Sequence, residues 1–319
     1  MTLSRPRARV TLDGQALSSA EAALARVEVS LWLGARHDHA YVALWPDSRF
    51  ADVAPGATLS IALGEDGAEE GVFSGTATRV TAGADGIEID GLSLSAKLSK
   101  FRRSQTYVEQ TVADIVRDLA GSVSVDSVAG DLKLASYSVD QRRSAWDHIV
   151  ELATLTGADV ASTASGALRF VRPRTGTPDV TLRYGADVLA WEIGPVVEPG
   201  VPKVAAHGAG SEAGSEQWHW VLASPPAQGN GDGPVDVVPA FTTRDAAEQL
   251  ARARAEAGKR AAVSARLTTL GRHDLRPGSL VRVSDLPTGD AGVLRVLGVE
   301  HCLDSRTGFV TNVTAEGAG

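Results

Sequence analysis

The residues whose types and spacing come closest to a metal-ligand set are His37, Asp38 and His39. Two imidazoles on one face of a strand, with a carboxylate nearby, could hold a divalent metal. No third ligand is identifiable, however, and zinc sites take three or four protein ligands. Because the cluster follows the first long predicted strand, a polar loop or strand edge is the preferred interpretation, and we predict neither a metal nor another cofactor.

The second chemical candidate is Cys302, the single cysteine of the chain, which stands next to His301 in an apolar stretch. A nucleophilic thiol needs a base within hydrogen-bond reach. Adjacent residues of a strand point to opposite faces, so these two side chains should not meet. We therefore expect a buried, unreactive thiol, and one cysteine excludes both an internal disulfide and a cysteine-based zinc cage.

The common catalytic motifs are absent from the sequence. It contains no GxSxG elbow, no GxxxxGK[ST] phosphate loop and no HExxH pair. The segment 229–233, GNGDG, lacks the regular acidic ligands of a calcium loop. No pair among the many carboxylates is singled out for glycoside hydrolysis. The sequence thus predicts no catalytic, cofactor-binding or metal-binding residue, and we expect a protein that is not an enzyme.

Five tryptophans in predicted β regions could stack on sugar rings, although core or interface packing is the commoner use of this residue. They are Trp32, Trp45, Trp191, Trp218 and Trp220. Trp218 and Trp220 should lie on the same face of a strand. These residues leave a carbohydrate-binding module open as an alternative function.

The composition and length of the chain argue against two further classes of protein and indicate how many domains to expect. A formal net charge of −8 argues against nucleic-acid-specific binding, which needs clustered Lys and Arg. No apolar run reaches the roughly 18 residues of a membrane span, so no membrane anchor is expected, and no secretion signal is visible. We expect a chain that is cytoplasmic at synthesis. At 319 residues it exceeds the usual size of one core and should form two to four domains.

The first of these units should be all-β and cover residues 1–100. Apolar and polar residues alternate over 27–33 and 58–63, which is typical of half-buried strands. Gly, Asp and Pro punctuate the intervals, as in a meandering antiparallel sheet or barrel. The apolar phase changes around Gly91, where we predict a bulge or a sharp bend.

A small α/β unit should follow over residues 101–185. Its first helix is predicted over 104–121, with Thr106 and Glu109 or Thr111 and Asp114 as the capping pair. The buried stripe of this helix should consist of Val108, Val112, Ile115, Val116 and Leu119. A second helix is predicted over 144–156, with a Ser144–Asp147 capping box and Gly157 at its end, and strands over 132–138, 158–162 and 167–171.

The third unit, residues 186–319, should return to β structure. Its segment 205–240 is predicted to be loop-rich: residues 206–215 and 228–233 are rich in Gly, Ser and Ala and should be exposed loops, with the strand of Trp218 and Trp220 between them. A helix with a Thr242 cap is expected over 242–260. Strands are predicted over 280–284, 293–303 and 308–315.

One internal echo bears on the architecture. Pro55-Gly56 and Pro277-Gly278 each precede an alternating strand, and Gly71-Val72 and Gly292-Val293 each open the next one. The chain could therefore contain two similar barrels. A Pro-Gly turn ahead of a strand is common, so a chance similarity stays open.

The two helices, the strand around Phe170 and the carboxyl-terminal strands together resemble the phage late control D family. These are tail hub proteins, similar to the amino-terminal hub part of VgrG and to hubs of other contractile injection systems. The residues that carry the resemblance, which we expect to pack rather than react, include Tyr107, Val112, Ile115, Val116, Leu119, Trp146, Ile149, Leu152, Gly157, Phe170, Pro277 and Gly278.

The resemblance implies a mainly β fold with an α+β insertion: two tube-like β-barrels separated by a small α/β domain, assembling as a pseudo-sixfold trimeric ring. It implies a structural hub that joins a sixfold inner tube to a threefold spike at the baseplate and ends up in a phage tail or injection particle. The expected partners are two more copies, the inner tube protein, baseplate proteins and a separate spike protein, because the chain stops after the second barrel. A tail-tip cell-wall hydrolase or a carbohydrate-binding module is the alternative.

Overall fold

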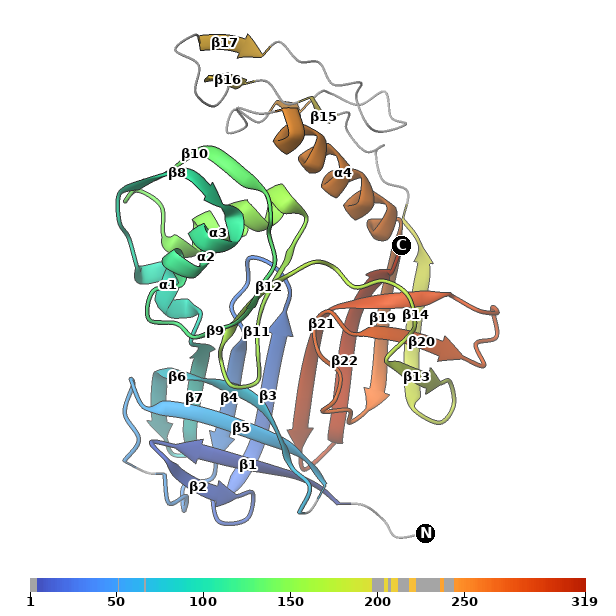
Figure 1. Ribbon diagram of the computed structural model, residues 1–319. Coiled ribbons are helices and arrows are strands. Elements are labelled where there is room, and N and C mark those ends of the chain that lie inside the picture. The colour runs from blue at the N-terminus through green and yellow to red at the C-terminus, as the bar shows by residue number, and fades with distance from the viewer. Residues whose placement is uncertain are drawn as a thin grey trace.

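The computed structural model describes residues 5–50, 52–65, 67–196, 204–205, 208–211, 218–221, 236–237 and 244–319. About half of the described residues lie in strands, and the largest sheet has 13 strands (Figure 1). The prediction of a mainly β fold with an inserted α/β unit is confirmed. Among the described helices, none has both the length and the apolar character needed to cross a membrane.

The first half of the large sheet is built from residues that precede the inserted module. Across the sheet its strands run β3-β4-β7-β6-β5-β1-β2, and every neighbouring pair is antiparallel. Their bounds are β1 Pro6–Leu12, β2 Gln15–Ser18, β3 Leu24–Trp32, β4 His39–Leu44, β5 Thr58–Glu65, β6 Glu70–Gly83 and β7 Gly86–Ser93.

The second half follows the same plan, with strands in the order β14-β19-β22-β21-β20-β13. Their bounds are β13 Val180–Arg183, β14 Val188–Pro195, β19 Val263–Leu270, β20 Leu280–Ser284, β21 Val293–Asp304 and β22 Gly308–Gly317. In chain order, β1, β3, β4, β5, β6 and β7 thus correspond to β13, β14, β19, β20, β21 and β22. One pair differs, because β13 runs parallel to β20 whereas β1 runs antiparallel to β5.

The correspondence extends to single hydrogen bonds at the two Pro-Gly turns. Gly56 N–H donates to the carbonyl of Ala77 at 2.8 Å, and Gly278 N–H donates to that of Val296 at 2.8 Å. Both glycines have positive φ, which residues with a side chain rarely adopt. The echo in the sequence therefore reflects a real structural repeat.

Two bulges of the first half recur in the second, whereas a third bulge, at Val72 between β5 and β6, has no counterpart in the β20–β21 ladder. The register shifts by one residue at Thr78 of β6 and at Leu297 of β21, and again at Ala25 of β3 and Leu189 of β14. The bulge predicted around Gly91 is present in the ladder at Gly91 and Asp90, but the extra residue is Thr78 on the neighbouring strand β6 and not a residue of β7. Because a bulge re-aims a strand and increases its twist, matching bulges give the halves matching curvature.

The prediction of two tube-like barrels needs a correction. Within the described residues neither half closes: no ladder joins β3 to β1 or β2, and between β13 and β14 there is only the isolated bridge of Tyr184, which follows β13, with Val188. Each strand has two edges, and the second edge of β3 is occupied by β21. The strand that would close the first half instead joins it to the second, so both halves form one continuous sheet.

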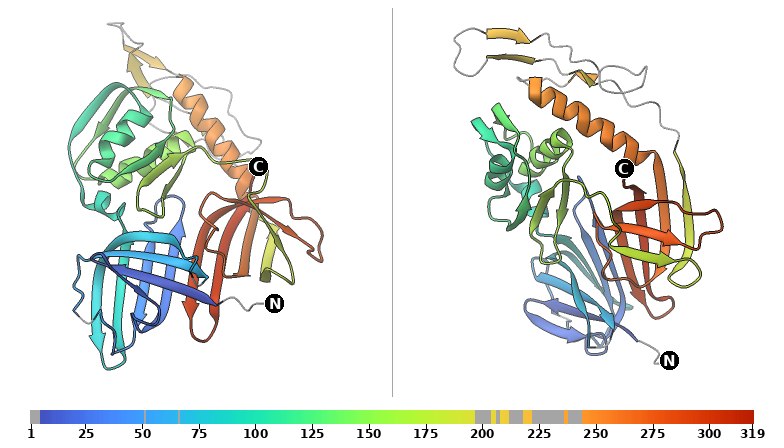
Figure 2. Two further views of the ribbon diagram at one scale, coloured as in Figure 1. Left: turned by 60° about the horizontal axis from the view of Figure 1, so that its bottom comes forward. Right: turned by 45° about the vertical axis from the view of Figure 1, so that its right-hand side comes forward.

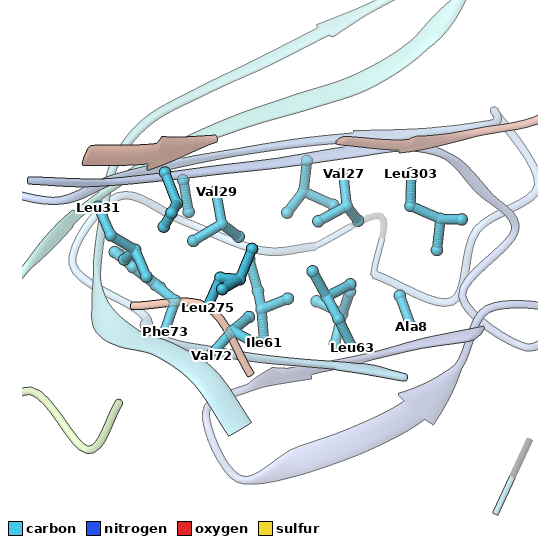
Figure 3. Close-up of a cluster of buried hydrophobic side chains, with 14 of the residues drawn as sticks. Ala8, Val27, Val29, Leu31, Ile61, Leu63, Val72, Phe73, Leu275 and Leu303 are labelled. Atoms are coloured by element: carbon cyan, nitrogen blue, oxygen red, sulfur yellow. The ribbon is translucent and has the colours of Figure 1, made fainter. Parts of the chain in front are cut away.

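One hydrophobic core runs through both halves. Leu275, from the connection between β19 and β20, is fully buried in it. Figure 3 shows this side chain among Leu31, Ile61 and Phe73 of the first half. The second half therefore contributes a residue to the core of the first, and we expect the two halves to fold together.

The inserted module packs its own core between helices and two small sheets. Strands β10 and β8 pair with each other, and β11, β12 and β9 form the second sheet. The bounds are α1 Ala96–Lys100, β8 Gln105–Thr111, α2 Val112–Ala120, β9 Val125–Val128, β10 Lys133–Val139, α3 Ala145–Thr156, β11 Asp159–Ser162 and β12 Leu168–Val171.

Helix α4, Arg244–Ala261, reaches from the module to the second half of the large sheet (Figures 1 and 2). Leu250 of α4 is buried in the core of the module. The loop-rich segment contains the predicted strand of Trp218 and Trp220, which is β17 Trp218–Val221. Three further short strands are β15 Val204–Ala205, β16 Gly208–Ser211 and β18 Asp236–Val237, of which β16 lies in a stretch predicted to be exposed loop. The predicted cap at Thr242 lies outside the described residues.

The first predicted helix was too long at its amino-terminal end. Residues Gln105–Thr111 form strand β8, and helix α2 begins at Val112. Val108 therefore faces away from the helix stripe and is 63% exposed, while Thr111 accepts the Asp114 N–H as the cap. The β-branched and aromatic residues of this stretch suit a strand once β10 provides a partner, and pairing overrides the helical spacing.

The second predicted helix is confirmed almost to the residue. Ser144 accepts the backbone N–H of Asp147, and the Asp147 carboxylate accepts that of Ser144, which is the predicted capping box. Gly157 ends α3 in the left-handed conformation at φ 69°. The strands predicted over 280–284, 293–303 and 308–315 correspond to β20, β21 and β22.

The division into units 1–100, 101–185 and 186–319 stays a prediction. Strand β13 pairs with β20, so the topology associates this strand with the second half.

Candidate functional site

The three parts of the chain meet at a junction around Asp38, which lies in the connection between β3 and β4. Its carboxylate accepts the Trp32 N–H at 2.9 Å and is 4% exposed. Burial raises the pKa of Asp38 to about 7, although the Trp32 hydrogen bond, the charge of Arg276 and the Ser162 hydroxyl act in the opposite direction. The three groups come from the first half, the second half and the inserted module, so the Asp38 carboxylate interacts with all three parts of the chain.

Arg276 fastens the second half onto the first. Its guanidinium donates to the carbonyls of Val72 at 2.8 Å and Gly71 at 2.6 Å, next to the place where Leu275 enters the core. Burial lowers the pKa of Arg276. No ion pair of this side chain occurs among the described residues. Backbone carbonyls therefore supply its main short contacts, which makes it a docking residue between the halves.

A second buried group links the module, the sheet and α4. The Arg295 guanidinium lies 2.6 Å from both carboxylate oxygens of Asp159 in β11 and 2.5 Å from Glu316 in β22. Arg260 of α4 donates to the same Glu316 at 3.2 Å. The Arg295 side chain is only 5% exposed. Burial lowers the pKa of Arg295, but the two carboxylates outweigh it and hold the pKa above its usual value.

Backbone contacts align the module at the same place. The N–H groups of Leu33 and Gly34 donate to the carbonyls of Leu297 and Val160, each at 2.8 Å. The indole N–H of Trp146 donates to the carbonyl of Ala35 at 2.9 Å. The short segment after β3 therefore contacts both the second half and the module, which fixes their relative positions.

A cleft of about 200 Å³ lies beside this junction, between β11 and β12 of the module and the Pro-Gly turn of the second half. Its walls carry Asp159 and Arg276, whose contacts are described above, and three further arginines. These three, Arg169, Arg172 and Arg174, pair with Asp126, Asp131 and Asp179 respectively. The charges of the cleft are therefore balanced by contacts within the chain.

His37 and His39 both make polar contacts with other side chains of the protein. The two ring nitrogens of His37 lie 2.9 and 2.6 Å from the hydroxyls of Ser95 and Ser99, and burial lowers the pKa of the ring. His39 lies 3.1 Å from the Asp90 carboxylate. Throughout the described part of the chain, no group of three His, Cys, Asp or Glu side chains is arranged to hold a metal.

The Cys302 thiol is half-buried rather than buried, and it lies near the carboxylates of Glu28 and Asp304. Burial raises its pKa. His301 is fully buried on the other face of β21, with its Nδ1 3.0 Å from the Thr311 hydroxyl, and burial lowers its pKa to about 3. As predicted, the two side chains do not meet.

The tryptophans are distributed rather than gathered. Trp45 is 53% exposed, Trp32 lies under the guanidinium of Arg36, and Trp191 contacts the ring of Tyr184. The side chains of Trp218 and Trp220 lie outside the described residues.

The residues that carried the family resemblance occupy packing positions. Nine of them lie in the core of the module: Tyr107, Val112, Ile115, Val116, Leu119, Trp146, Ile149, Leu152 and Phe170. Gly157 ends α3, and Pro277 is buried beside the left-handed Gly278. They position the module and the second Pro-Gly turn, and the module in turn supplies Asp159 and Ser162 to the junction.

Sequence reasoning missed the polar residues of the junction, namely Asp38 as a buried carboxylate, Asp159, Arg260, Arg276, Arg295 and Glu316. The available signal was charge inside apolar strands. Arg295 interrupts the run Val293-Leu294-Arg295-Val296, and a charge in such a run needs a buried partner. Nothing local identifies the partner, because Asp159 is far away in the sequence.

Comparison with solved structures places the fold among tail proteins. The chain resembles a tail protein of Neisseria meningitidis MC58 with a TM-score of 0.73 and 15% identity, covering 98% of this chain and 96% of that one. It resembles the 43 kDa tail protein of prophage MuSo2 from Shewanella oneidensis with a TM-score of 0.70 and 15% identity, covering 98% of both. An E. coli component of the type VI secretion system aligns with a TM-score of 0.61 and 14% identity, over 96% of this chain and 76% of its own.

At these identities the likeness shows the fold alone. A family model described as the Alg8 N-terminal domain matches residues 41–207, and the chain belongs to that family. A search of curated proteins finds no match.

Proposed function

We propose that the protein is a structural hub of a contractile phage tail or a related injection system. In this proposal it is a homotrimer that joins a sixfold inner tube to a threefold spike at the baseplate and has no catalytic role. The observation that carries the proposal is the repeat: two halves with the same strand order, bulges and turn hydrogen bonds lie side by side in one sheet. Three copies would present six such halves.

In this proposal the repeat allows a threefold protein to bind a sixfold one. A sixfold tube needs six similar docking surfaces, and a threefold spike needs three. A chain with two equivalent halves meets both requirements in one closed ring. The late control D resemblance and the likeness of the fold to tail proteins and to VgrG support the same proposal. The partners that the proposal includes are an inner tube protein, a spike protein and baseplate proteins.

Exposed apolar side chains beside one sheet edge also favour assembly. Leu189, Leu270 and Tyr184 are 54%, 49% and 37% exposed, respectively. They lie close together, because Leu270 N–H donates to Asp187 and Tyr184 bridges to Val188. Exposed apolar side chains beside a sheet edge without a strand ladder are typical of a contact surface.

The direct test is the mass of the protein in solution over a wide concentration range, alone and with candidate tube and spike proteins. We expect a trimer, stabilised further by the partners. A chain that stays monomeric at high concentration and with both partners present would contradict the hub proposal. Peptidoglycan release by the purified protein would favour the hydrolase alternative instead.

A further inference from the structure

The repeat identifies where one copy should contact the next. Along one edge β21 pairs with β22. Along the other edge its residues Val293 to Arg295 pair with β20, and residues Gly298 to Asp304 pair with β3. The second part of β21 is thus the site at which the two halves join within the chain.

Strand β6 is the counterpart of β21 and is arranged in the same way, with one difference. Its residues Glu70 to Thr76 pair with β5, and Gly75 to Gly83 pair with β7. Opposite β7, the stretch from Arg79 to Gly83 has no strand beside it in the part of the chain that the structure describes. This open stretch corresponds to the part of β21 that receives β3.

Strand β14 is the counterpart of β3 and is also open on one side. It pairs with β19 along one edge, and among the described residues no strand ladder lies along the other. In β3 the equivalent edge is the one that binds β21. Within the chain, β3 and β21 are paired. Their counterparts, β14 and β6, each have an edge without a strand ladder among the described residues, and these two edges could pair with each other between two copies.

We propose that β14 of one copy pairs antiparallel with residues 79–83 of β6 in a second copy, in the register that β3 and β21 adopt within the chain. The proposal rests on the proposed homotrimer and deepens it by naming the contact. The pairing is head-to-tail, since each copy offers β14 on one side and β6 on the other. Such contacts can close into a ring.

The matching bulges define the register. Ile193 stands four residues after the bulge at Leu189, as Val29 does after Ala25. On the other side, Ala82 stands four residues after the bulge at Thr78, as His301 does after Leu297. Because Val29 pairs with His301, Ile193 of one copy should pair with Ala82 of the next.

The neighbouring positions follow from the same register. The pairing of Ser30 with Glu300 transfers to Gly194 with Thr81 of the second copy. Leu33 N–H donates toward β21, so the odd-numbered residues of β3 point their N–H groups to that strand and Ser30 occupies a non-hydrogen-bonded position. Gly194 and Thr81 should therefore form a non-hydrogen-bonded pair.

Pro195 sets the limit of the contact. Val196 N–H donates to Ala262 on the β19 side, so the position of Pro195 faces the open edge, where proline is tolerated. Its missing N–H cannot donate to the second copy, while its carbonyl can still accept. In this register Ile193 is the β14 donor that faces residues 79–83, since Trp191 would lie opposite Ala84 of the turn after β6, and the same proline discourages longer, non-specific pairing.

A cysteine cross-link tests the register. In a Cys302→Ser background, Gly194→Cys and Thr81→Cys should place two thiols at a non-hydrogen-bonded pair, where the Cα atoms are about 4.5 Å apart, within disulfide range. A Cβ at Gly194 meets no atom within 4 Å, and Thr81 is exposed. On mild oxidation we expect covalent dimers and trimers on a non-reducing gel.

The matched control combines Gly194→Cys with Gly83→Cys, which moves one thiol two residues along β6. A Cβ at Gly83 also meets nothing within 4 Å. The diagonal separation becomes about 7–8 Å, so cross-linking should fall at least about tenfold. Equal cross-linking of both pairs would overturn the register.

Two outcomes separate this inference from the hub proposal. A trimeric mass for both reduced variants without a cross-link at the designed pair would overturn the β14–β6 contact and leave the trimer standing. A monomeric mass under all conditions would overturn the trimer and, with it, the contact.

Discussion

The two halves of the large sheet share strand order, bulges and turn geometry, yet they differ in what lies along their edges. The first half has β21 against β3, whereas the equivalent edge of the second half, along β14, bears no strand ladder among the described residues. The joined edge is surrounded by Arg276, Arg295 and the segment after β3, which fasten the module and both halves. The edge of β3 is thus paired within the chain, and the equivalent edge of β14 is available for pairing with another copy.

Duplication alone therefore does not produce equivalent interfaces. The joined edge has buried charges and a shared core, which suits a permanent contact. The open edge has exposed apolar residues and a proline, which suits a contact that forms only when another copy arrives. Substitutions at the two edges should therefore change different properties: unfolding at the first, association at the second.

The largest effect is expected at Arg295, in the joined region. Arg295→Met leaves the buried Asp159 without its cation and leaves Glu316 with Arg260 alone, so it should lower the free energy of unfolding by about 3–5 kcal/mol. Chemical denaturation measures the change. Arg266→Met, which removes an ion pair that is 73% and 77% exposed, is the control and should cost less than about 1 kcal/mol. Equal losses for the two variants would contradict the role assigned to the buried group.

The second prediction compares the loss of stability caused by substitutions at equivalent positions before the two Pro-Gly turns. Leu275→Ala removes a fully buried side chain and should destabilise by about 2–5 kcal/mol. Its counterpart Val53 is half-buried, so Val53→Ala should cost about 1 kcal/mol. Calorimetry or denaturant unfolding provides both values. A larger loss at Val53 would show that the second half does not contribute the dominant anchor.

A pH-dependent effect of intermediate size should come from Asp38. The folded protein holds this proton up to pH about 7, while an unfolded aspartate releases it near pH 4. Between these values the folded state binds more protons, so raising the pH across this window should reduce the free energy of unfolding, in total by about 4 kcal/mol. Asp38→Asn keeps an acceptor for the Trp32 N–H and should flatten the dependence. A wild-type profile that rises over this window, relative to that of the variant, would exclude the assigned shift.

The smallest effect on folding, with a clear effect on association, is expected at the open edge. Ile193→Pro removes an N–H that should face the second copy, whereas Ile193→Thr keeps it while also shortening the side chain. Unfolding of the two variants should differ by less than about 1 kcal/mol, and only the proline variant should dissociate at roughly fivefold to tenfold higher concentration. Analytical ultracentrifugation reads out the dissociation. Identical association of both variants would argue against pairing at β14.

Local chemistry was sufficient wherever a signal spans one turn or one strand. The Ser144–Asp147 capping box, the left-handed Gly157 and the alternating strand β20 were predicted from the sequence and are present in the structure. The buried stripe of α2 was also correct from Val112 onward, since helical spacing alone places these side chains on one face. The repeat was visible as two Pro-Gly turns, because only glycine readily adopts their positive φ.

Only the tertiary structure decided the features that depend on distant partners. Strand β8 replaced the start of a predicted helix because β10 pairs with it, and β3 joined β21 instead of closing a barrel. The partners of Arg295 and the destination of Leu275 lie far from them in the sequence. Short-range patterns determine which face of an element is apolar. Which edge or charge meets which partner depends on the whole chain packing into one sheet, and no local spacing encodes that choice.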